Sequence, residues 1–428
     1  MYFFLAYVNF TALSYKGEIV VNVVKLVNKY KNIVFYVSVI VLSALFLFIG
    51  NRVASGENID TYDEFEDLSF YSAIVTGITG IEERDQFGFI NTTIYFEARI
   101  TWGARRGDMV FAEQHQSDFF IDNIRDIQTG DRVLLVYDFF ASRYIFTDYA
   151  RFNTIAILGI AFLVAVIIFG RIKGLNAIVA LGFTCMAVFF VFVPAILAGR
   201  NIYIATLIVC LFSIISTLLI VIGPNKKALS AMLGCLGGVA VAGGLMFAMD
   251  RILQLSGLVD QDAQVLLMLE NPINLRAIIF AGVILGAVGA IMDVAMTIAS
   301  SLWEVKEAGG ENSFTSLMES GINIGKDILG TMLNTLILAY IGSSLSLILL
   351  INVHTTSSLE LFNMELIIVE FLRAIVGSIG MFLTIPLTAG ICGWLYTWNE
   401  EEKEKPSVPA VNTQSDFFAE YYRNNKDK

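Results

Sequence analysis

Histidine and cysteine are scarce in this chain of 428 residues, and their scarcity excludes several kinds of site. The two histidines, His115 and His354, stand alone in the sequence, so no zinc-binding spacing is present. The four cysteines are Cys185, Cys210, Cys235 and Cys392. All four fall within long apolar runs, where a thiol usually behaves as a small apolar side chain. We therefore expect neither a disulfide framework nor a zinc site.

A glycine-rich phosphate-binding loop with its lysine is also missing from the sequence. We therefore do not expect this chain alone to use ATP, and no pattern in it points to a cofactor. Oxygen ligands for a hard cation are available, so a site of that kind stays open, but the sequence does not define its ligands.

Long apolar runs dominate what is present. Apolar residues make up 56% of the chain, its mean hydropathy is +0.69, and several runs approach the roughly 20 residues that cross a bilayer as a helix. This predicts a polytopic α-helical membrane protein with about eight transmembrane helices, whose lipid partner is the bilayer. We place the spans near residues 33–50, 152–170, 177–198, 202–222, 228–249, 277–302, 328–351 and 369–397. An even number of spans puts both termini on the same side.

The basic residues predict the orientation of these spans. They cluster before the first span and on alternate loops: Lys16, Lys25, Lys29 and Lys31, then Arg171 with Lys173, Lys226 with Lys227, Lys306 with Lys326, and Lys403 in the tail. Positive loops are usually cytoplasmic, so we expect both termini in the cytoplasm and residues 51–151 outside.

The segment 51–151 differs in composition from the rest of the chain. It has no lysine, nine arginines and eighteen Asp and Glu residues, and so carries most of the chain's formal charge of −11. Such an acidic surface disfavours nucleic acid as a partner. Runs rich in Val, Ile, Tyr, Phe and Thr at 71–79, 89–102, 109–113, 133–138 and 144–147 predict five strands. We expect a small β-rich domain, an OB-like barrel, between the first and second helices.

The predicted organisation has five parts. A cytoplasmic N-terminal segment covers 1–32, the first transmembrane helix 33–50, the extracytoplasmic β domain 51–151, a bundle of about seven helices 152–397, and a cytoplasmic polar tail 398–428. Residues 1–20 fit this plan poorly, because their apolar start is too short to span a membrane and lacks the pattern of a signal peptide. Whether they are translated is left open.

One polar stripe interrupts the span at 277–302. At about 100° per residue, a single helix face carries Gly282, Gly286, Gly289, Asp293, Thr297, Ser300 and Glu304, and Glu307 follows on the same face where the helix leaves the membrane. The glycines are expected to let another helix approach closely. A carboxylate such as that of Asp293 costs several kcal/mol in the membrane unless it is paired or wetted, so we interpret it as functional. Glu304 stands where the helix leaves the membrane and is equally well explained as a solvated charge.

A second polar stripe follows on the next helical segment. Asn323, Asp327, Gly330 and Asn334 again share one face, with Glu319 preceding them. Because a short loop joins the two segments, antiparallel packing would bring Asp293 near Asn334, and Asp327 near Thr297 or Ser300. Asn334 is explained equally well by a hydrogen bond between helices. In the last span, Arg373 has two readings, as a headgroup anchor or as an ion pair with Glu370 or Asp250.

The two stripes also carry a resemblance. Residues 286–302 (GAVGAIMDVAMTIASSL) and 325–340 (GKDILGTMLNTLILAY) resemble the YibE/F family of bacterial membrane proteins, as do 129–133 (TGDRV) and 147–151 (TDYAR) in the acidic segment. The resemblance implies a multi-pass architecture in a bacterial plasma membrane. It places Asp293, Asp327, Gly330 and Asn334 in its longest segments but assigns them no role.

Three functions fit these observations. A carrier or channel for a small cation or a proton-coupled solute explains Asp293 directly and is the function we predict. The alternative is a non-catalytic accessory or assembly protein that acts through its extracytoplasmic domain. An intramembrane enzyme is disfavoured, because the carboxylate motifs and Ser/His pairs of such enzymes are missing. For a transporter or an accessory protein alike, we expect the assembly to be completed by a second related membrane chain or by further copies of this chain.

Overall fold

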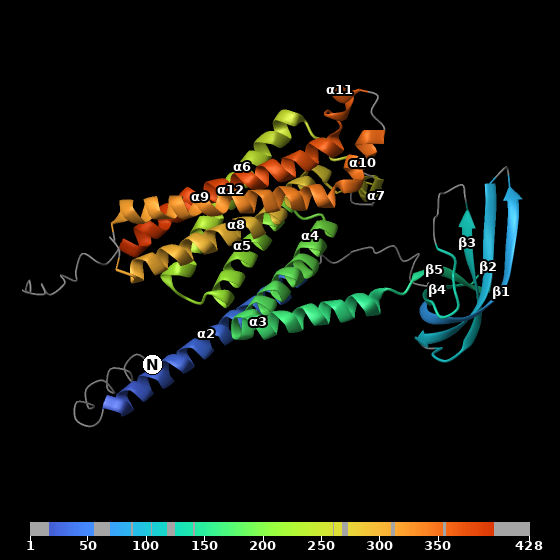
Figure 1. The fold of residues 1–428 in the computed structure, drawn as a ribbon, viewed down its shortest axis with the longest axis horizontal. Coiled ribbons are helices and arrows are strands. Elements are labelled where there is room, and N and C mark those ends of the chain that lie inside the picture. The colour runs from blue at the N-terminus through green and yellow to red at the C-terminus, as the bar shows by residue number, and fades with distance from the viewer. Residues whose placement is uncertain are drawn as a thin grey trace, which may run out of the picture. The chain divides into compact units, whose positions relative to one another are not determined.

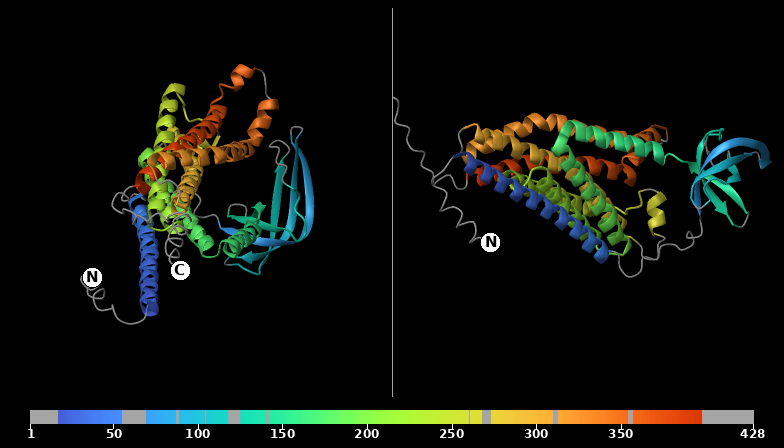
Figure 2. Two further views of the ribbon diagram at one scale, coloured as in Figure 1. Left: turned by 60° about the vertical axis from the view of Figure 1, so that its left-hand side comes forward. Right: turned by 90° about the horizontal axis from the view of Figure 1, so that it is seen from below.

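The protein is described by a computed structural model that covers residues 17–54, 69–86, 89–103, 105–117, 125–139, 142–259, 261–267, 273–309, 313–353 and 357–397 (Figures 1 and 2). The expectations about residues 1–16, His354 and the tail 398–428 lie outside these ranges. The chain forms two compact units, residues 58–178 and residues 1–57 with 179–428. We call them the β unit and the helical unit, and describe each by itself.

Seven described helices are long and apolar enough to cross a membrane. They run within α2 (Gly17–Ala54), the continuous stretch of α3 (Phe152–Ala187), η3 (Val188–Phe192) and α4 (Val193–Leu197), α5 (Ile202–Val221), α6 (Lys226–Leu253), α8 (Leu275–Glu307), α9 (Phe314–Ser343) and α12 (Glu365–Thr397). Three shorter helices are α7 (Gln261–Leu267), α10 (Leu345–Val353) and α11 (Ser358–Leu361). The chain is therefore a multi-pass membrane protein in contact with the bilayer.

The count of seven differs from the predicted eight at one place. The two spans predicted at 152–170 and 177–198 are two helical segments that meet at Arg171 without a loop, so that they count together as one candidate span, Phe152–Leu197. Arg171 has φ 49° and ψ −127°, a conformation outside the α-helix. The prediction that both termini lie in the cytoplasm requires that this stretch crosses the membrane twice, once on each side of Arg171.

The β unit confirms the five predicted strands as one mixed sheet. These are β1 (Phe70–Gln86), β2 (Phe89–Trp102), β3 (Met109–Ser117), β4 (Arg132–Asp138) and β5 (Arg143–Tyr149). The order is β1-β2-β3-β5-β4, and β4 pairs back onto β1. All pairs are antiparallel except β3 with β5. Alternating residues point inward, so that Val75, Phe96, Ile100 and Leu135 form a fully buried core.

A buried ion pair reinforces the short parallel ladder between β3 and β5. Glu113 is 3% exposed, and its carboxylate accepts hydrogen bonds of 2.8 Å from both Nε and Nη1 of Arg143. The Nε2 atom of His115 lies 2.8 Å from Oε1 of the same carboxylate. The ladder itself pairs only Ala112 with Tyr144 and Glu113 with Ile145. Because the backbone pairs only two residues of each strand, the side-chain ion pair supplies additional contacts between β3 and β5.

Replacing Glu113 with Gln is expected to loosen this junction. The neutral amide cannot accept two hydrogen bonds from the guanidinium, so the β unit should lose about 1 to 3 kcal/mol of stability. Hydrogen exchange of β3 and β5 in the intact protein measures the loss. The matched control is Glu82→Gln, because Glu82 pairs with Arg84 at the surface and exposed pairs contribute little. Equal protection of the two strands in both variants would refute the assignment.

In the helical unit, α12 lies among α6, α8 and α9 and contacts all three (Figure 1). Glycines permit these close contacts. A Cβ atom on Gly238 of α6 would lie 1.9 Å from Oγ1 of Thr384, and one on Gly325 of α9 would lie 2.2 Å from Cγ2 of Ile385. The glycine-rich side of α6 is thus a packing face, and this helix lies in the core of the helical unit.

Polar contacts fix both ends of α12. At its C-terminal end, Lys226 of α6 donates to the carbonyl of Leu395, and Lys306 of α8 donates to the carbonyl of Tyr396. Positive charges are favourable at this end of a helix. At its N-terminal end, the Glu365 carboxylate accepts hydrogen bonds of 2.6 Å from the Ser256 hydroxyl and from the backbone N–H of Gly257. The loop after α6 is thereby held against the start of α12.

Candidate functional site

Asp293 occupies an open position in the middle of α8. It stands 18 residues, or about 27 Å, from the first residue of the helix. Its neighbours Ile291, Val294 and Ala295 are buried in the core, while Asp293 lies on the exposed side. Within the described residues, no side chain or backbone group forms a hydrogen bond or ion pair with its carboxylate. Only its backbone carbonyl is used, as an acceptor for the Thr297 hydroxyl at 2.7 Å.

The remaining residues of the α8 stripe follow the same exposed side. Gly282, Gly286, Gly289 and Glu304 are exposed, and Thr297 and Ser300 are half-buried. The α9 stripe is also exposed, at Asn323, Asp327, Gly330 and Asn334, because α9 turns its opposite side, with Gly321 and Gly325, toward α12. The sequence therefore predicted which polar residues share a face on each helix. In the structure, these faces point away from the helical core, which packs against the opposite side of each helix.

Two contacts fix how α9 runs beside α8. Near one end, a Cβ on Gly286 would lie 3.4 Å from the Tyr340 hydroxyl; near the other, a Cβ on Gly321 would lie 2.9 Å from Leu302. The helices are thus antiparallel. Counting residues between these contacts places Asp293 level with Thr331 and Met332, one turn or less from Asn334.

The same count aligns the rest of the two stripes. Thr297 is level with Asp327, and Ser300 with Asn323. Glu304 is level with Glu319. Each polar position of α8 therefore has a polar counterpart on α9 at the same depth. Within the described residues, however, no hydrogen bond or ion pair joins a polar side chain of one stripe to a polar side chain of the other, so their proximity stays a prediction.

The α8 stripe ends beside an ion pair at its N-terminal end. Arg373 of α12 donates from Nη1 to the Glu370 carboxylate at 2.6 Å, and the Ser344 hydroxyl donates to the same carboxylate at 2.9 Å. Both charged side chains are only partly exposed. Of the two readings of Arg373, the ion pair with Glu370 is the one that the structure contains, while Asp250 is not its partner.

Two glycines predicted to pack helices instead accommodate polar groups. A Cβ on Gly282 would lie 3.9 Å from Nη2 of Arg373, and Gly286 adjoins the Tyr340 hydroxyl. Nothing lies within 4 Å of a Cβ placed on Gly289 or on Gly330, so neither contacts a helix within the described parts of the chain. Helix packing at these two positions stays a prediction and would need a second chain.

Sequence reasoning missed Tyr340 as part of this region. Its hydroxyl is buried between Gly286 and Gly377 and finds no hydrogen-bond partner within the described residues. An aromatic residue near the end of a span usually anchors the helix at the interface, so nothing in the sequence distinguished it. Its hydroxyl is a free donor and acceptor next to Arg373, Glu370 and the start of the α8 stripe.

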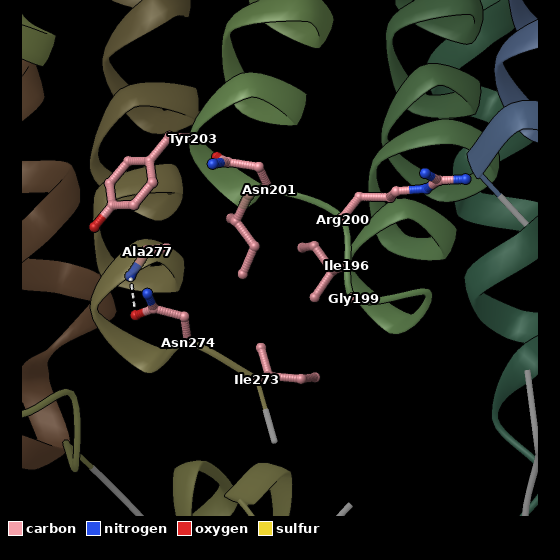
Figure 3. Close-up of a pocket in the computed structure, with 9 residues that line it drawn as sticks. Ile196, Gly199, Arg200, Asn201, Tyr203, Ile273, Asn274 and Ala277 are labelled. Atoms are coloured by element: carbon pink, nitrogen blue, oxygen red, sulfur yellow. Dashed lines mark hydrogen bonds between the residues drawn. The ribbon is translucent and has the colours of Figure 1, made fainter. Parts of the chain in front are cut away.

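A separate cavity of about 240 Å³ lies where α5 and α8 begin (Figure 3). Its polar residues are already engaged. The side chains of Asn201 and Asn274 cap the two helices by accepting from the N–H groups of Ile204 and Ala277, each at 3.2 Å. Arg200 points away from the other lining residues and donates to the carbonyl of Val53. The cavity therefore has structural polar groups and no carboxylate, unlike the stripes.

No cluster of three or more His, Cys, Asp or Glu side chains that could hold a metal ion occurs within the described residues. Oxygen atoms for a hard cation are nevertheless spread along the stripes, at Asp293, Thr297, Ser300 and, on α9, Asp327 and Asn334.

The fold and the stripes define a class: a multi-pass membrane protein with polar residues along two of its bundle helices. The model of the YibE/F-like protein family matches residues 158–398, and the chain belongs to that family. The match includes both stripes and α12, but not the five strands β1–β5. No curated protein and no solved structure matches the chain.

Proposed function

We propose that the protein is a carrier or channel for a small cation or a proton-coupled solute, and that the polar stripes of α8 and α9 line its path. The observation that carries this proposal is the unpaired carboxylate of Asp293 at mid-helix. Transport proteins use such groups because they can alternate between protonated, ion-bound and hydrated states. A purely structural carboxylate would instead be expected to have a fixed partner.

The polar residues of α9 that stand at the same depths as those of α8 make the proposed path continuous along the two helices. Along α8, the Thr297 and Ser300 hydroxyls continue from Asp293 toward Glu304, and Asp327 and Asn323 stand at matching depths on α9. A hydrated cation or proton moving along them would meet an oxygen ligand at each turn of helix. At the opposite end, the Arg373–Glu370 pair and Tyr340 are the charged and polar groups that mark the entrance.

The orientation belongs to the same proposal. We place the chain in a bacterial plasma membrane with both termini in the cytoplasm and residues 51–151 outside, following the distribution of its basic residues. The entrance near Arg373 then faces outward and Glu304 faces the cytoplasm. The closed strand order of the β unit supports an OB-like barrel on the outer side.

The test is a flux screen in proteoliposomes, with protons, monovalent cations and divalent cations examined in turn. Flux of one species by the wild-type protein supports the proposal. If protein shown to be folded carries none of them, the proposed cation path is refuted and the accessory function becomes the working hypothesis.

One observation favours the accessory function. The β unit has a groove of about 840 Å³ beside Trp102, whose side chain is 74% exposed, with Arg132 and Asp148 in its lining. The backbone N–H of Tyr149 donates to Asp148, and together with Arg151 it lowers the pKa of that carboxyl, which stays ionised at neutral pH. An exposed aromatic side chain between charged groups suits a binding surface.

Deletion of residues 51–151 separates the two functions. If the path lies in the helices, the deletion should leave flux measurable in proteoliposomes, since the stripes belong to α8 and α9. Loss of flux from a variant that remains folded would instead assign an essential part of transport to the deleted segment. An accessory protein should lose its partner altogether, which co-purification with the full chain and the shortened chain would show.

A further inference from the structure

The two polar stripes leave a problem that one copy of the chain does not solve. Asp293, Asp327 and Asn334 are exposed, yet they belong to helices that cross the membrane. Lipid offers no partner to a carboxylate or an amide, and an ionised side chain at this depth costs several kcal/mol. Something other than lipid must therefore cover this surface.

The composition of α9 points the same way. Its most apolar window has a mean hydropathy of 1.2, the lowest of the seven candidate spans. Its described buried residues are only Leu317, Gly321 and Gly325, all in its first half. A helix that is both this polar and this exposed is poorly suited to face acyl chains on its own.

Small residues and open space mark the surface as a place where a helix fits. Among the described residues, no atom of another part of the chain lies within 4 Å of a Cβ placed on Gly289 or Gly330. Gly330 is level with Asp293, and Gly289 stands one turn from it on the same face. Glycines at such positions let a second backbone approach closely, as in packed transmembrane helices. A neighbouring helix seated there would cover Asp293.

We infer that two copies of this chain associate through the exposed faces of α8 and α9, so that the path lies between the copies. This inference rests on the proposed function. A two-fold axis along the membrane normal places α8 of one copy opposite α9 of the other at equal depth. Asp293 then faces Gly330 and Asn334 of the second copy, and Thr297 faces its Asp327.

A second copy fits better than an unrelated chain because the face complements itself. The α8 stripe supplies the Asp293 carboxylate, the α9 stripe supplies the Asn334 amide, and Lys326 beside the α9 stripe supplies an ammonium group; all three are exposed. Under two-fold symmetry, each contact between α8 of one copy and α9 of the other forms twice in the assembly. Within the described residues of one chain, no hydrogen bond or ion pair joins the two stripes, and association supplies such partners.

Cysteine cross-linking tests the contact. Two differently tagged chains are co-expressed, one with Gly289→Cys and one with Asn334→Cys, both with the exposed Cys185 replaced by Ser. Oxidation should yield a species that carries both tags. The control pair is Gly244→Cys with Gly342→Cys, two glycines that also have open space but lie off the stripes, and it should not cross-link. No cross-linking of the first pair, or equal cross-linking of both, would overturn the inference.

Flux in mixed assemblies gives a second, independent result. When wild-type chains and Asp293→Asn chains are mixed in equal amounts before the copies associate, a single path that needs Asp293 of both copies retains about one quarter of the wild-type flux. Independent single-chain paths retain about one half. The latter value, obtained together with flux that depends on Asp293, would refute the shared path and leave the proposed function standing. Cross-linking of the first pair in a protein that carries no ion would support the association of two copies and refute the proposed function.

Discussion

Asp293→Asn is expected to abolish flux through the protein while leaving its fold intact. Asparagine keeps the shape and volume of the side chain, and no described group depends on the Asp293 carboxylate for a hydrogen bond, so packing should not change. What disappears is the negative charge and the capacity to bind and release a proton. A group of this kind commonly contributes 100-fold or more to a proton-transfer step, and we expect a loss of at least about that size.

The control for this experiment is a second carboxylate on the same helix. Glu307→Gln makes the same chemical change near the end of α8, where the Glu307 carboxylate accepts a hydrogen bond of 2.8 Å from the Trp303 indole. It should retain most of the flux, because an exposed carboxylate at a helix end is solvated. Both variants are reconstituted at matched amounts after circular dichroism shows equal helicity. Unchanged flux in Asp293→Asn would remove this residue from the path.

Gly238→Ala is expected to destabilise the helical unit by about 1 to 3 kcal/mol, although it adds only a methyl group. The new Cβ would lie 1.9 Å from Oγ1 of Thr384 and 2.9 Å from Cγ2 of Ile291. Thr384 is fully buried, and its hydroxyl donates to the carbonyl of Gly380 at 2.7 Å, so a rotation that relieves the contact breaks that hydrogen bond. The α6–α12 packing must therefore open.

The same helix offers a control with the opposite sign. Nothing lies within 4 Å of a Cβ on Gly244, which is exposed on α6. Alanine there should stabilise the helix by a few tenths to about 1 kcal/mol, because it restricts the unfolded chain more than glycine does. Unfolding of both variants in mixed micelles by denaturing detergent measures the difference. Equal midpoints for the two variants would contradict the packing described for α6.

The sequence predicted the elements that follow from local pattern. Apolar runs located the membrane helices, alternation of Val, Ile and aromatic residues located all five strands, and helical spacing aligned Asp293 with Thr297 and Ser300. These patterns depend on residues that are close together in the sequence, so they can be recognised without knowing which other elements pack against them.

What the sequence did not predict depends on contacts distant along the chain. The spacing that marked Gly282 and Gly286 as a groove did not reveal that polar groups of Arg373 and Tyr340 adjoin it, since those residues come from two other helices. Likewise, the parallel pairing of β3 with β5 has no local signature. Sequence reasoning also placed the two polar stripes near each other; the structure shows that most of their residues are exposed, and the proximity of their side chains stays a prediction.

The hydrogen bonds at the ends of α12 have a mechanical consequence. Lysines from α6 and α8 hold its C-terminal end, and the loop after α6 is bound to its N-terminal end. These three helices therefore behave as one stiff frame. The fourth helix of this group, α9, also packs on α12, at Gly321 and Gly325, and the Ser344–Glu370 hydrogen bond joins the residue after its last turn to α12. If the protein alternates between states open to opposite sides, we expect α6, α8 and α12 to move together as one body.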